Sequence, residues 1–367
     1  MLKLPLLGQR HPRYTIALAG LVLCAYWFLS SSAPPLRPVH YNANHELKAR
    51  LEREERKYRD MVPQRHDLIT KFGPTPAQVV MFPPDQDPWP AYTVWDFFPP
   101  VFNCPHELDR LGALGDGGKW ICGISRIQDK PDCVVYSFGI DSSYSFEAVL
   151  LQSTRFCQVW IYDSTKGDGA KNHIPRSLRH RVHFAKLALG ATDRHGASDD
   201  PKRWTLRSLM SENGHSHIDF LRLDVEGWEW ETFRAIIRDF TMERGSPANG
   251  ASVWGVPERE GVLPFGQLQI ELHVWNQRFQ DFLEWWELLE IAGLRPFHNE
   301  INLIYANYNR GSGVELAEYS FLNVRGENAF IKDYVPVEPE TDHVARENEQ
   351  EAERLQRIRH GAGPARR

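Results

Sequence analysis

Short apolar segments of strand length alternate with segments of helical pattern between Cys133 and Ala292. The strand candidates are Cys133 to Ile140, Cys157 to Tyr162, Arg181 to Leu189, Ile218 to Val225 and Gln267 to Val274. The helix candidates are Ser145 to Gln152, Trp204 to Asn213, Trp228 to Phe240 and Phe279 to Ala292. Because parallel strands are joined by crossovers that are usually helical, this alternation predicts an α/β fold with a mainly parallel sheet and helices on both faces.

Two further strands are predicted at Glu300 to Ala306 and Glu318 to Val324, on either side of the turn-rich segment Asn307 to Gly313. No helix is expected between them, which indicates an antiparallel addition at the edge of the sheet. The complete sheet then has seven strands, mainly parallel, with an antiparallel edge strand.

The overall composition excludes two classes of protein. Of the 367 residues, 42% are hydrophobic and 12% aromatic, so the bulk of the chain folds around a core. The formal net charge of -5 gives no general attraction to a phosphate backbone. Nucleic acid is therefore not expected as a partner.

An N-terminal hydrophobic segment predicts attachment to a membrane. Thr15 to Ala33 contains no charged side chain and is just long enough to span a bilayer as a helix. Lys3, Arg10 and Arg13 precede it, which predicts a type II signal anchor with the rest of the chain in the lumen of the Golgi or endoplasmic reticulum. A cleaved signal peptide is the alternative, because Ser31 to Ala33 resembles a cleavage site. Both interpretations place the main domain in the secretory pathway.

The remaining parts of the chain are assigned by composition. Asn44 to Met61 is a charge-dense helical pattern, interpreted as a solvated spacer in preference to a partner-binding helix. The Pro-rich stretch Phe72 to Pro100 carries aromatic residues that are expected to pack on the domain as irregular structure. The predicted organisation is a cytoplasmic tail (1–14), anchor (15–33), stem and linker (34–94), catalytic domain (95–330) and charged tail (331–367).

Four cysteines lie in the predicted lumenal part: Cys104, Cys122, Cys133 and Cys157. An even set in an oxidising compartment indicates two disulfides, with all three possible pairings open. Four buried thiols are the alternative. No paired C-x-x-C spacing argues for zinc.

Ligands of such sheets lie beyond the carboxyl ends of the strands, so the residues there are the candidate site. The first strand ends in Ser137-Phe138-Gly139-Ile140-Asp141, where Gly139 lets the backbone approach a cofactor closely and Asp141 follows it. A single glycine is not the G-x-G-x-x-G of dinucleotide binding, so NAD is not supported. The second strand ends at Asp163, which can accept hydrogen bonds from ribose hydroxyls or, alternatively, act as a turn aspartate.

The fourth strand leads into Leu221-Arg222-Leu223-Asp224-Val225-Glu226-Gly227-Trp228-Glu229. This segment resembles the L-K-I-D-V-E-G-x-E segment of FkbM-type methyltransferases, with Arg222 in place of the usual Lys. Together with Gly115-Asp116-Gly117-Gly118-Lys119-Trp120-Ile121-Cys122 and Ser137-Phe138-Gly139, it looks similar to the methyltransferase-like protein 24 group. The likeness covers Phe102 to Val324. It implies a class I Rossmann-like fold, S-adenosylmethionine as methyl donor and, as in many members, a hydroxyl oxygen as acceptor, but it does not identify the acceptor.

Methyl transfer to a hydroxyl needs a positioned acceptor and a base near the methyl group. Asp224 is the first candidate, either as that base or as the partner of the methionine ammonium, and Glu226 is its neighbour. Glu271 and His273 alternate at the end of the fifth strand, so they face the same side and could complete the site. His273 could instead be an ordinary hydrogen-bonded histidine. Asp224, Glu271 and His273 together could also bind a divalent metal, a weaker interpretation that we do not adopt from sequence.

The loop from Gly115 to Lys119 is not a P-loop, because Ala113 and Trp120 occupy the positions of the required glycine and hydroxyl residue. By resemblance it covers the cofactor, with Asp116 and Lys119 near the pocket. A plain glycine turn is the alternative.

These residues predict O-methylation of a lumenal glycan, lipid or small molecule, with S-adenosylmethionine as cofactor and the oligomeric state open. Two other classes are retained. One is a catalytically inactive binding domain of the same fold. The other is a type II glycosyltransferase, whose only Asp-x-Asp would be Asp85-Gln86-Asp87, enclosed by prolines.

Overall fold

The computed structural model describes residues 44–81, 94–140, 143–165, 172–243, 259–308 and 314–332. All of them belong to one compact unit, Asn44–Arg367. Within these ranges no helix combines the length and apolar character that crossing a bilayer requires. The predicted anchor, Thr15 to Ala33, lies outside the described residues, as does the tail beyond residue 332.

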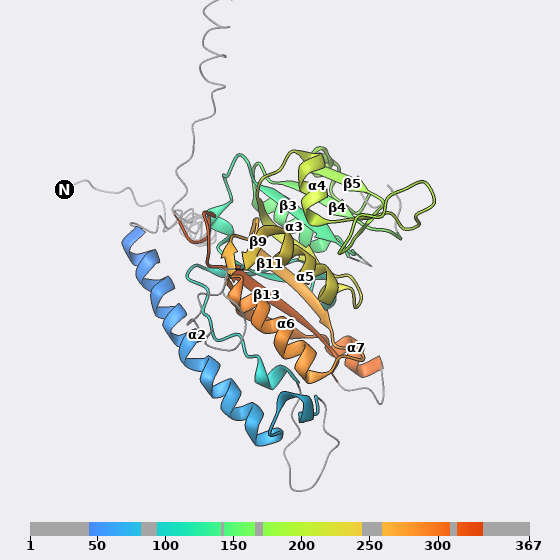
Figure 1. Ribbon diagram of the computed structural model, residues 1–367. Coiled ribbons are helices and arrows are strands. Elements are labelled where there is room, and N and C mark those ends of the chain that lie inside the picture. The colour runs from blue at the N-terminus through green and yellow to red at the C-terminus, as the bar shows by residue number, and fades with distance from the viewer. Residues whose placement is uncertain are drawn as a thin grey trace, which may run out of the picture. The chain divides into compact units, whose positions relative to one another are not determined.

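A seven-stranded sheet forms the centre of the fold (Figure 1). Its spatial order is β12 (Leu294–Ile301), β13 (Leu316–Asn323), β11 (Phe265–His273), β8 (Ile218–Leu223), β3 (Val134–Phe138), β4 (Gln158–Tyr162) and β5 (Val182–Ala185). The five strands from β11 to β5 run parallel. β13 is antiparallel to both β11 and β12. The predicted fold class is confirmed, with the antiparallel strand lying second from the edge.

Helices cover both faces, as predicted. Alternate residues of the strands enter two separate apolar clusters, because successive side chains of a strand point to opposite faces. One cluster includes residues of α4 (Leu206–Asn213), α5 (Glu229–Phe240) and α6 (Phe279–Ile291). The other includes residues of α3 (Ser145–Ser153). Trp95, Phe97 and Phe98 pack in the first cluster, so the irregular Pro-rich segment does contact the domain there.

The prediction of a strand at Glu300 to Ala306 is wrong. The strand lies earlier, at Leu294–Ile301, and the short helix α7 (Leu303–Tyr308) follows it. The polar stretch His298, Asn299 and Glu300 conceals the strand pattern, and Pro296 is tolerated because β12 is the outermost strand. Asn302 then begins the helix, since its side-chain oxygen accepts from the Tyr305 backbone N–H at 3.0 Å.

The region predicted as a third strand, Arg181 to Leu189, divides in two. β5 ends at Ala185, and Ala188–Leu189 forms β6, which pairs with β7 (Arg203–Trp204) outside the main sheet. The helix predicted from Trp204 begins at Leu206 instead, because Thr205 caps it through its side-chain oxygen.

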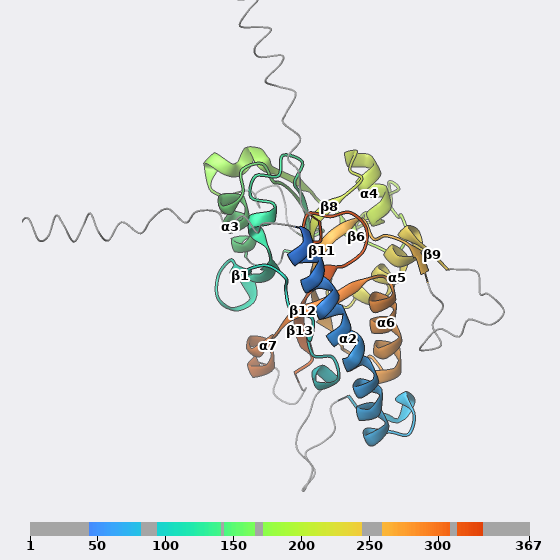
Figure 2. The ribbon, with the colours of Figure 1, turned by 90° about the vertical axis from the view of Figure 1, so that its left-hand side faces the viewer.

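The helix α2 (Asn44–Phe72) is longer than predicted and is not a solvated spacer. Apolar residues at helical spacing, among them Leu47, Tyr58 and Ile69, are buried. Figure 2 shows α2 crossing in front of β12 and α6. Arg295 of β12 makes a bidentate ion pair with Glu55 at 2.7 and 2.8 Å, so the helix is part of the domain.

Both disulfides of the two-disulfide interpretation are present. Cys104 pairs with Cys122, the last residue of β2 (Lys119–Cys122), with 5.6 Å between their Cα atoms. β2 pairs with β1 (Leu108–Leu111) in a small antiparallel sheet. Cys133 pairs with Cys157, with 4.4 Å between Cα atoms, and joins the beginnings of β3 and β4.

Candidate functional site

A pocket of about 220 Å³ opens at the carboxyl ends of β3, β4 and β8. We call it the first pocket. Asp163, directly after β4, and Asp224, directly after β8, both line it, together with Gly139 after β3. Two acidic residues that are 61 positions apart in the sequence numbering therefore share one crevice at the strand ends, as the sequence predicts.

Gly139 is required by the backbone geometry of this edge. Its φ of +68° lies in the left-handed region, and a Cβ there would come within 1.5 Å of the Asp224 carbonyl oxygen. The Gly139 N–H donates to Tyr162 O, and the Asp224 N–H donates to Phe138 O. The glycine thus permits the close approach of the β3 and β8 ends that forms the floor of the first pocket.

Asp163 is only 4% exposed, and its orientation is determined locally. Its Oδ1 accepts from the backbone N–H and from the hydroxyl of Thr165, both at 2.7 Å. The aspartate therefore makes a turn and also lines the pocket, so both sequence interpretations describe part of its environment. Burial, and then the charge of Asp163, raise the pKa of the nearby Tyr144 to about 12.

Residues to which the sequence analysis gave no role also line the first pocket. The Arg203 guanidinium lies over the Trp228 ring, 4.5 Å from its centroid. Leu187 and Leu189 add apolar surface to the same pocket. The position of Trp228 inside the family-like segment was an available signal, whereas Arg203 comes from β7, whose partnership with β6 is a tertiary feature.

The turn after β8 has an unusual backbone. Glu226 has a φ of +47° and Gly227 has a φ of +93°. Positive φ is costly for a residue with a side chain and tends to persist at functional sites. Glu226 is exposed at the mouth of the first pocket.

Asp224, Glu271 and His273 converge, and we call these three residues the central cluster. One potential ligand atom from each lies within 4.8 Å of those of the other two. Glu271 and His273 thus face the same side as one another, as predicted, and Asp224 lies beside them. Burial, followed by the charge of Glu271, raises the pKa of Asp224 to about 7. A carboxyl with that pKa can exchange a proton near neutral pH.

His273 is oriented by Glu229, a carboxylate to which the sequence analysis gave no role. Glu229 is fully buried, and its Oε1 accepts from His273 Nδ1 at 2.7 Å and from the Gly227 N–H at 3.1 Å. Burial disfavours the imidazolium, yet the hydrogen bond and charge of Glu229 outweigh it and raise the pKa of His273. The second glutamate of the V-E-G-x-E pattern was the signal for this partner.

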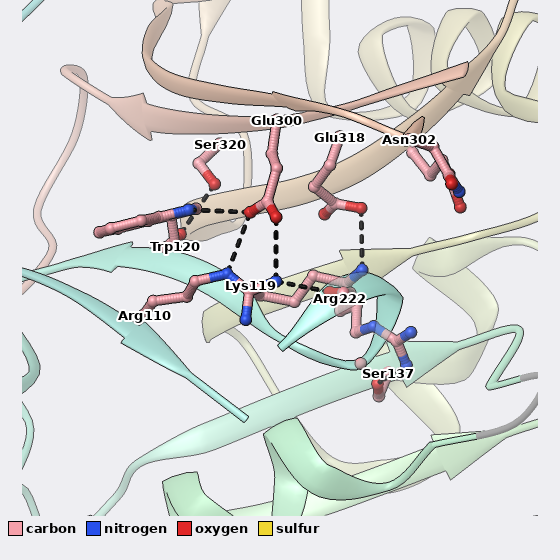
Figure 3. Close-up of polar contacts among 12 residues, drawn as sticks. Arg110, Lys119, Trp120, Ser137, Arg222, Glu300, Asn302, Glu318 and Ser320 are labelled. Atoms are coloured by element: carbon pink, nitrogen blue, oxygen red, sulfur yellow. Dashed lines mark hydrogen bonds and ion pairs between the residues drawn. The ribbon is translucent and has the colours of Figure 1, made fainter. Parts of the chain in front are cut away.

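A second pocket of about 500 Å³ borders the central cluster. Glu271 lines it, and Asn302 Nδ2 donates to Glu271 Oε1 at 2.8 Å. The charged residues Lys119, Glu318 and Glu300 also line it. Lys119 pairs with Glu318 at 2.9 Å, and Glu300 pairs with Arg110 at 3.0 Å. Figure 3 shows Glu300 held by Arg110 and the Trp120 indole, with Glu318 beside it.

The remaining predicted cofactor contacts have different outcomes. Lys119 is buried at the second pocket and does not line the first, so the geometry disfavours its predicted contact with the cofactor. Asp141 and the side chain of Asp116 lie outside the described part of the chain, as does Asp85-Gln86-Asp87. Their assignments stay predictions.

Comparison with known proteins supports a methyltransferase. Residues 77–252 match a family model described as a methyltransferase domain. Among solved structures, the chain is similar to the fibrillarin pre-rRNA processing protein of Methanococcus jannaschii (10% identity, 59% of this chain and 71% of that chain, TM-score 0.31). It is also similar to methyltransferase FkbM from Methylobacillus flagellatus KT (12% identity, 52% and 44%, TM-score 0.31).

A third similar structure is StiE O-MT, residues 961–1257 (12% identity, 54% of this chain and 71% of that chain, TM-score 0.29). Structural likeness at this level carries no argument about activity. No curated protein matches the chain. The match of residues 77–252 to a methyltransferase-domain model confirms the predicted resemblance to methyltransferases.

Proposed function

We propose that this methyltransferase transfers the methyl group of S-adenosylmethionine to a hydroxyl oxygen of a lumenal glycan, lipid or small molecule. The observation that carries the proposal is the shared first pocket, where Asp163 and Asp224 meet at the carboxyl ends of parallel strands.

The residues of the first pocket fit S-adenosylmethionine. Asp163 would accept hydrogen bonds from the ribose hydroxyls, and Leu187, Leu189 and Tyr162 supply apolar surface for the adenine ring. Asp224 or the neighbouring Glu226 would bind the methionine ammonium. When bound, this cofactor supplies an electrophilic methyl group on a sulfonium.

The second pocket would receive the acceptor. Glu271 lines this pocket, while Asp224 lines the first, so the central cluster stands between the two. A hydroxyl oxygen that approaches through the second pocket would meet the cluster before it reaches the methyl group. The cluster is thus placed to promote loss of the hydroxyl proton, and Glu229 holds His273 in one orientation for that task.

We extend the proposal to location: a type II membrane protein whose catalytic domain faces the lumen. The charge-free segment Thr15 to Ala33 and the preceding basic residues support the anchor. The two disulfides support an oxidising compartment. Protease protection of the domain in intact microsomes would test this arrangement, and digestion without detergent would contradict it.

Calorimetry of the full chain in detergent micelles tests the cofactor. We expect one saturable site each for S-adenosylmethionine and S-adenosylhomocysteine. A folded sample that binds neither would refute the proposed function. An inactive binding domain would bind S-adenosylmethionine without ever forming S-adenosylhomocysteine when offered membrane extracts as a source of acceptor, so product formation distinguishes the two classes.

A further inference from the structure

The central cluster presents three metal-ligating groups to one point. Asp224 comes from the end of β8, and Glu271 and His273 come from β11, the next strand in the sheet. We propose that Asp224, Glu271 and His273 bind a divalent transition-metal cation between the two pockets. Binding of the cation follows from these side chains alone, whereas its catalytic role rests on the proposed function.

Two of the three donors are buried yet keep an atom without a hydrogen bond. Glu271 is 5% exposed and His273 is 3% exposed. Glu271 uses Oε1 for Asn302, and His273 uses Nδ1 for Glu229. Within the described residues, no hydrogen bond engages Glu271 Oε2 or His273 Nε2. Neither atom is among the fully buried unpaired polar atoms of the described residues, so both are accessible to a ligand.

The residues that hydrogen-bond to Glu271 and His273 also match those found around metal sites. A histidine that binds a metal usually gives its other ring N–H to a carboxylate, which orients the ring and increases its basicity. Glu229 makes this contact to His273, and it is fully buried. Asn302 similarly holds one oxygen of Glu271. Glu271 and His273 are therefore both held in place by residues outside the cluster.

The size and chemistry of the cluster select the kind of cation. Carboxylate and imidazole ligands lie ~2.1 Å from such ions, so two ligand atoms on one ion are at most ~4.2 Å apart. The observed limit of 4.8 Å between the donor atoms is close to that. Two carboxylates with one imidazole suit Mn²⁺ or Zn²⁺ better than Ca²⁺ or Cu⁺.

A cation here would have coordination positions open toward the pockets. Because metal binding lowers the pKa of a bound hydroxyl, an acceptor oxygen on the cation would release its proton to water in the second pocket. The alkoxide would then form the new O–C bond as the S–C bond of S-adenosylmethionine breaks, leaving S-adenosylhomocysteine.

Titration of the chelator-treated full chain with Mn²⁺, followed by electron paramagnetic resonance of the free ion, tests the site. We expect saturable binding at about one Mn²⁺ per chain and a rise in the thermal unfolding midpoint on binding. Asp224→Asn, Glu271→Gln and His273→Ala should each abolish saturable binding. Glu229→Gln should weaken it ~10- to 100-fold, because Glu229 acts through His273.

Glu231→Gln is the matched control, since Glu231 is an exposed carboxylate on the same helix as Glu229. It should bind Mn²⁺ as the unaltered chain does. Each variant is first shown by circular dichroism and cooperative thermal unfolding to be folded, so that misfolding is recognised. A chain that binds S-adenosylmethionine but no Mn²⁺, or Mn²⁺ binding that survives all three ligand substitutions, would overturn the metal site and leave the proposed function standing.

Discussion

The two pockets that border the central cluster are built differently. The first lies where adjacent parallel strands end, and Gly139, Asp163 and Asp224 line it there. The second is lined by the ion-paired side chains of Lys119, Glu300 and Glu318 together with apolar residues of the segment 301–304. The first pocket thus depends on the regular sheet, whereas the second depends on ion pairs between segments remote in sequence.

This difference indicates that the two pockets bind different kinds of ligand. Strand-end geometry recurs throughout the fold class and suits a constant ligand such as a cofactor. Charged walls assembled from a loop and the last strands are free to vary and suit an acceptor that differs between enzymes. Four variants test whether the pockets are separable in this way.

The largest effect is expected at the central cluster. His273→Ala should reduce turnover ~10²- to 10⁴-fold, because a group that assists proton transfer is lost. The affinity for S-adenosylmethionine, measured by calorimetry, should change little, since His273 does not line the first pocket. An equal loss in both quantities would show that the two pockets are not separable.

Substitution of a charged residue in the wall of the second pocket should mainly lower the stability of the protein. Lys119 is 2% exposed and pairs with Glu318, whose pKa is raised by burial and only partly restored by Lys119. Lys119→Met should lower the free energy of unfolding by ~3–5 kcal/mol, because it leaves a buried carboxylate unpaired. Denaturant unfolding measures this, and adding Glu318→Gln should recover part of the loss. Additive losses in the double variant would argue against coupling of the pair.

Substitution in the first pocket should instead lower the affinity for S-adenosylmethionine. Asp163→Asn should weaken S-adenosylmethionine binding ~10- to 100-fold, because hydrogen bonds to a charged acceptor contribute ~1.5–3 kcal/mol. Asp129→Asn, at an exposed position, is the control and should bind normally. If Asp163→Asn loses stability but binds the cofactor with unchanged affinity, its role is confined to the Thr165 turn.

The smallest effect concerns the ion pair of Arg110 with the partly exposed Glu300. Burial raises the pKa of Glu300, but hydrogen bonds from Arg110 and Trp120 outweigh it and hold the pKa below 4.5. A carboxyl whose pKa is lower in the folded state stabilises the fold at pH values above its unfolded-state pKa. This contribution to stability is lost as the pH falls through the folded-state pKa. Glu300→Gln should therefore cost only ~0.2–1 kcal/mol at neutral pH. As the pH falls from the unfolded-state pKa, ~4.3, through the lower folded-state pKa, the two proteins should converge in unfolding experiments; a difference that persists once the carboxyl is protonated in both states would have another cause.

Local patterns predicted much of the fold and part of the site. The strands ending at Asp163 and Asp224 were recognisable because buried parallel strands are continuous apolar runs. The outer strand β12 was misplaced because an edge strand tolerates proline and polar residues. The role of α2 was predicted wrongly because its many charged residues concealed a narrow apolar stripe that includes Tyr58 and Ile69. The burial of this stripe is seen only in the tertiary structure.

The sequence by itself determined the alternation of strands and helices, and with it the edge at which Asp163, Asp224, Glu271 and His273 had to appear. Strand periodicity and the rule that parallel strands end together are local or topological, so they can be read without coordinates. The tertiary structure alone decided that Glu229 turns back to His273 and that Lys119 faces Glu318. Such contacts join residues 44 and 199 positions apart, and side-chain direction and packing, which no local pattern encodes, bring them together.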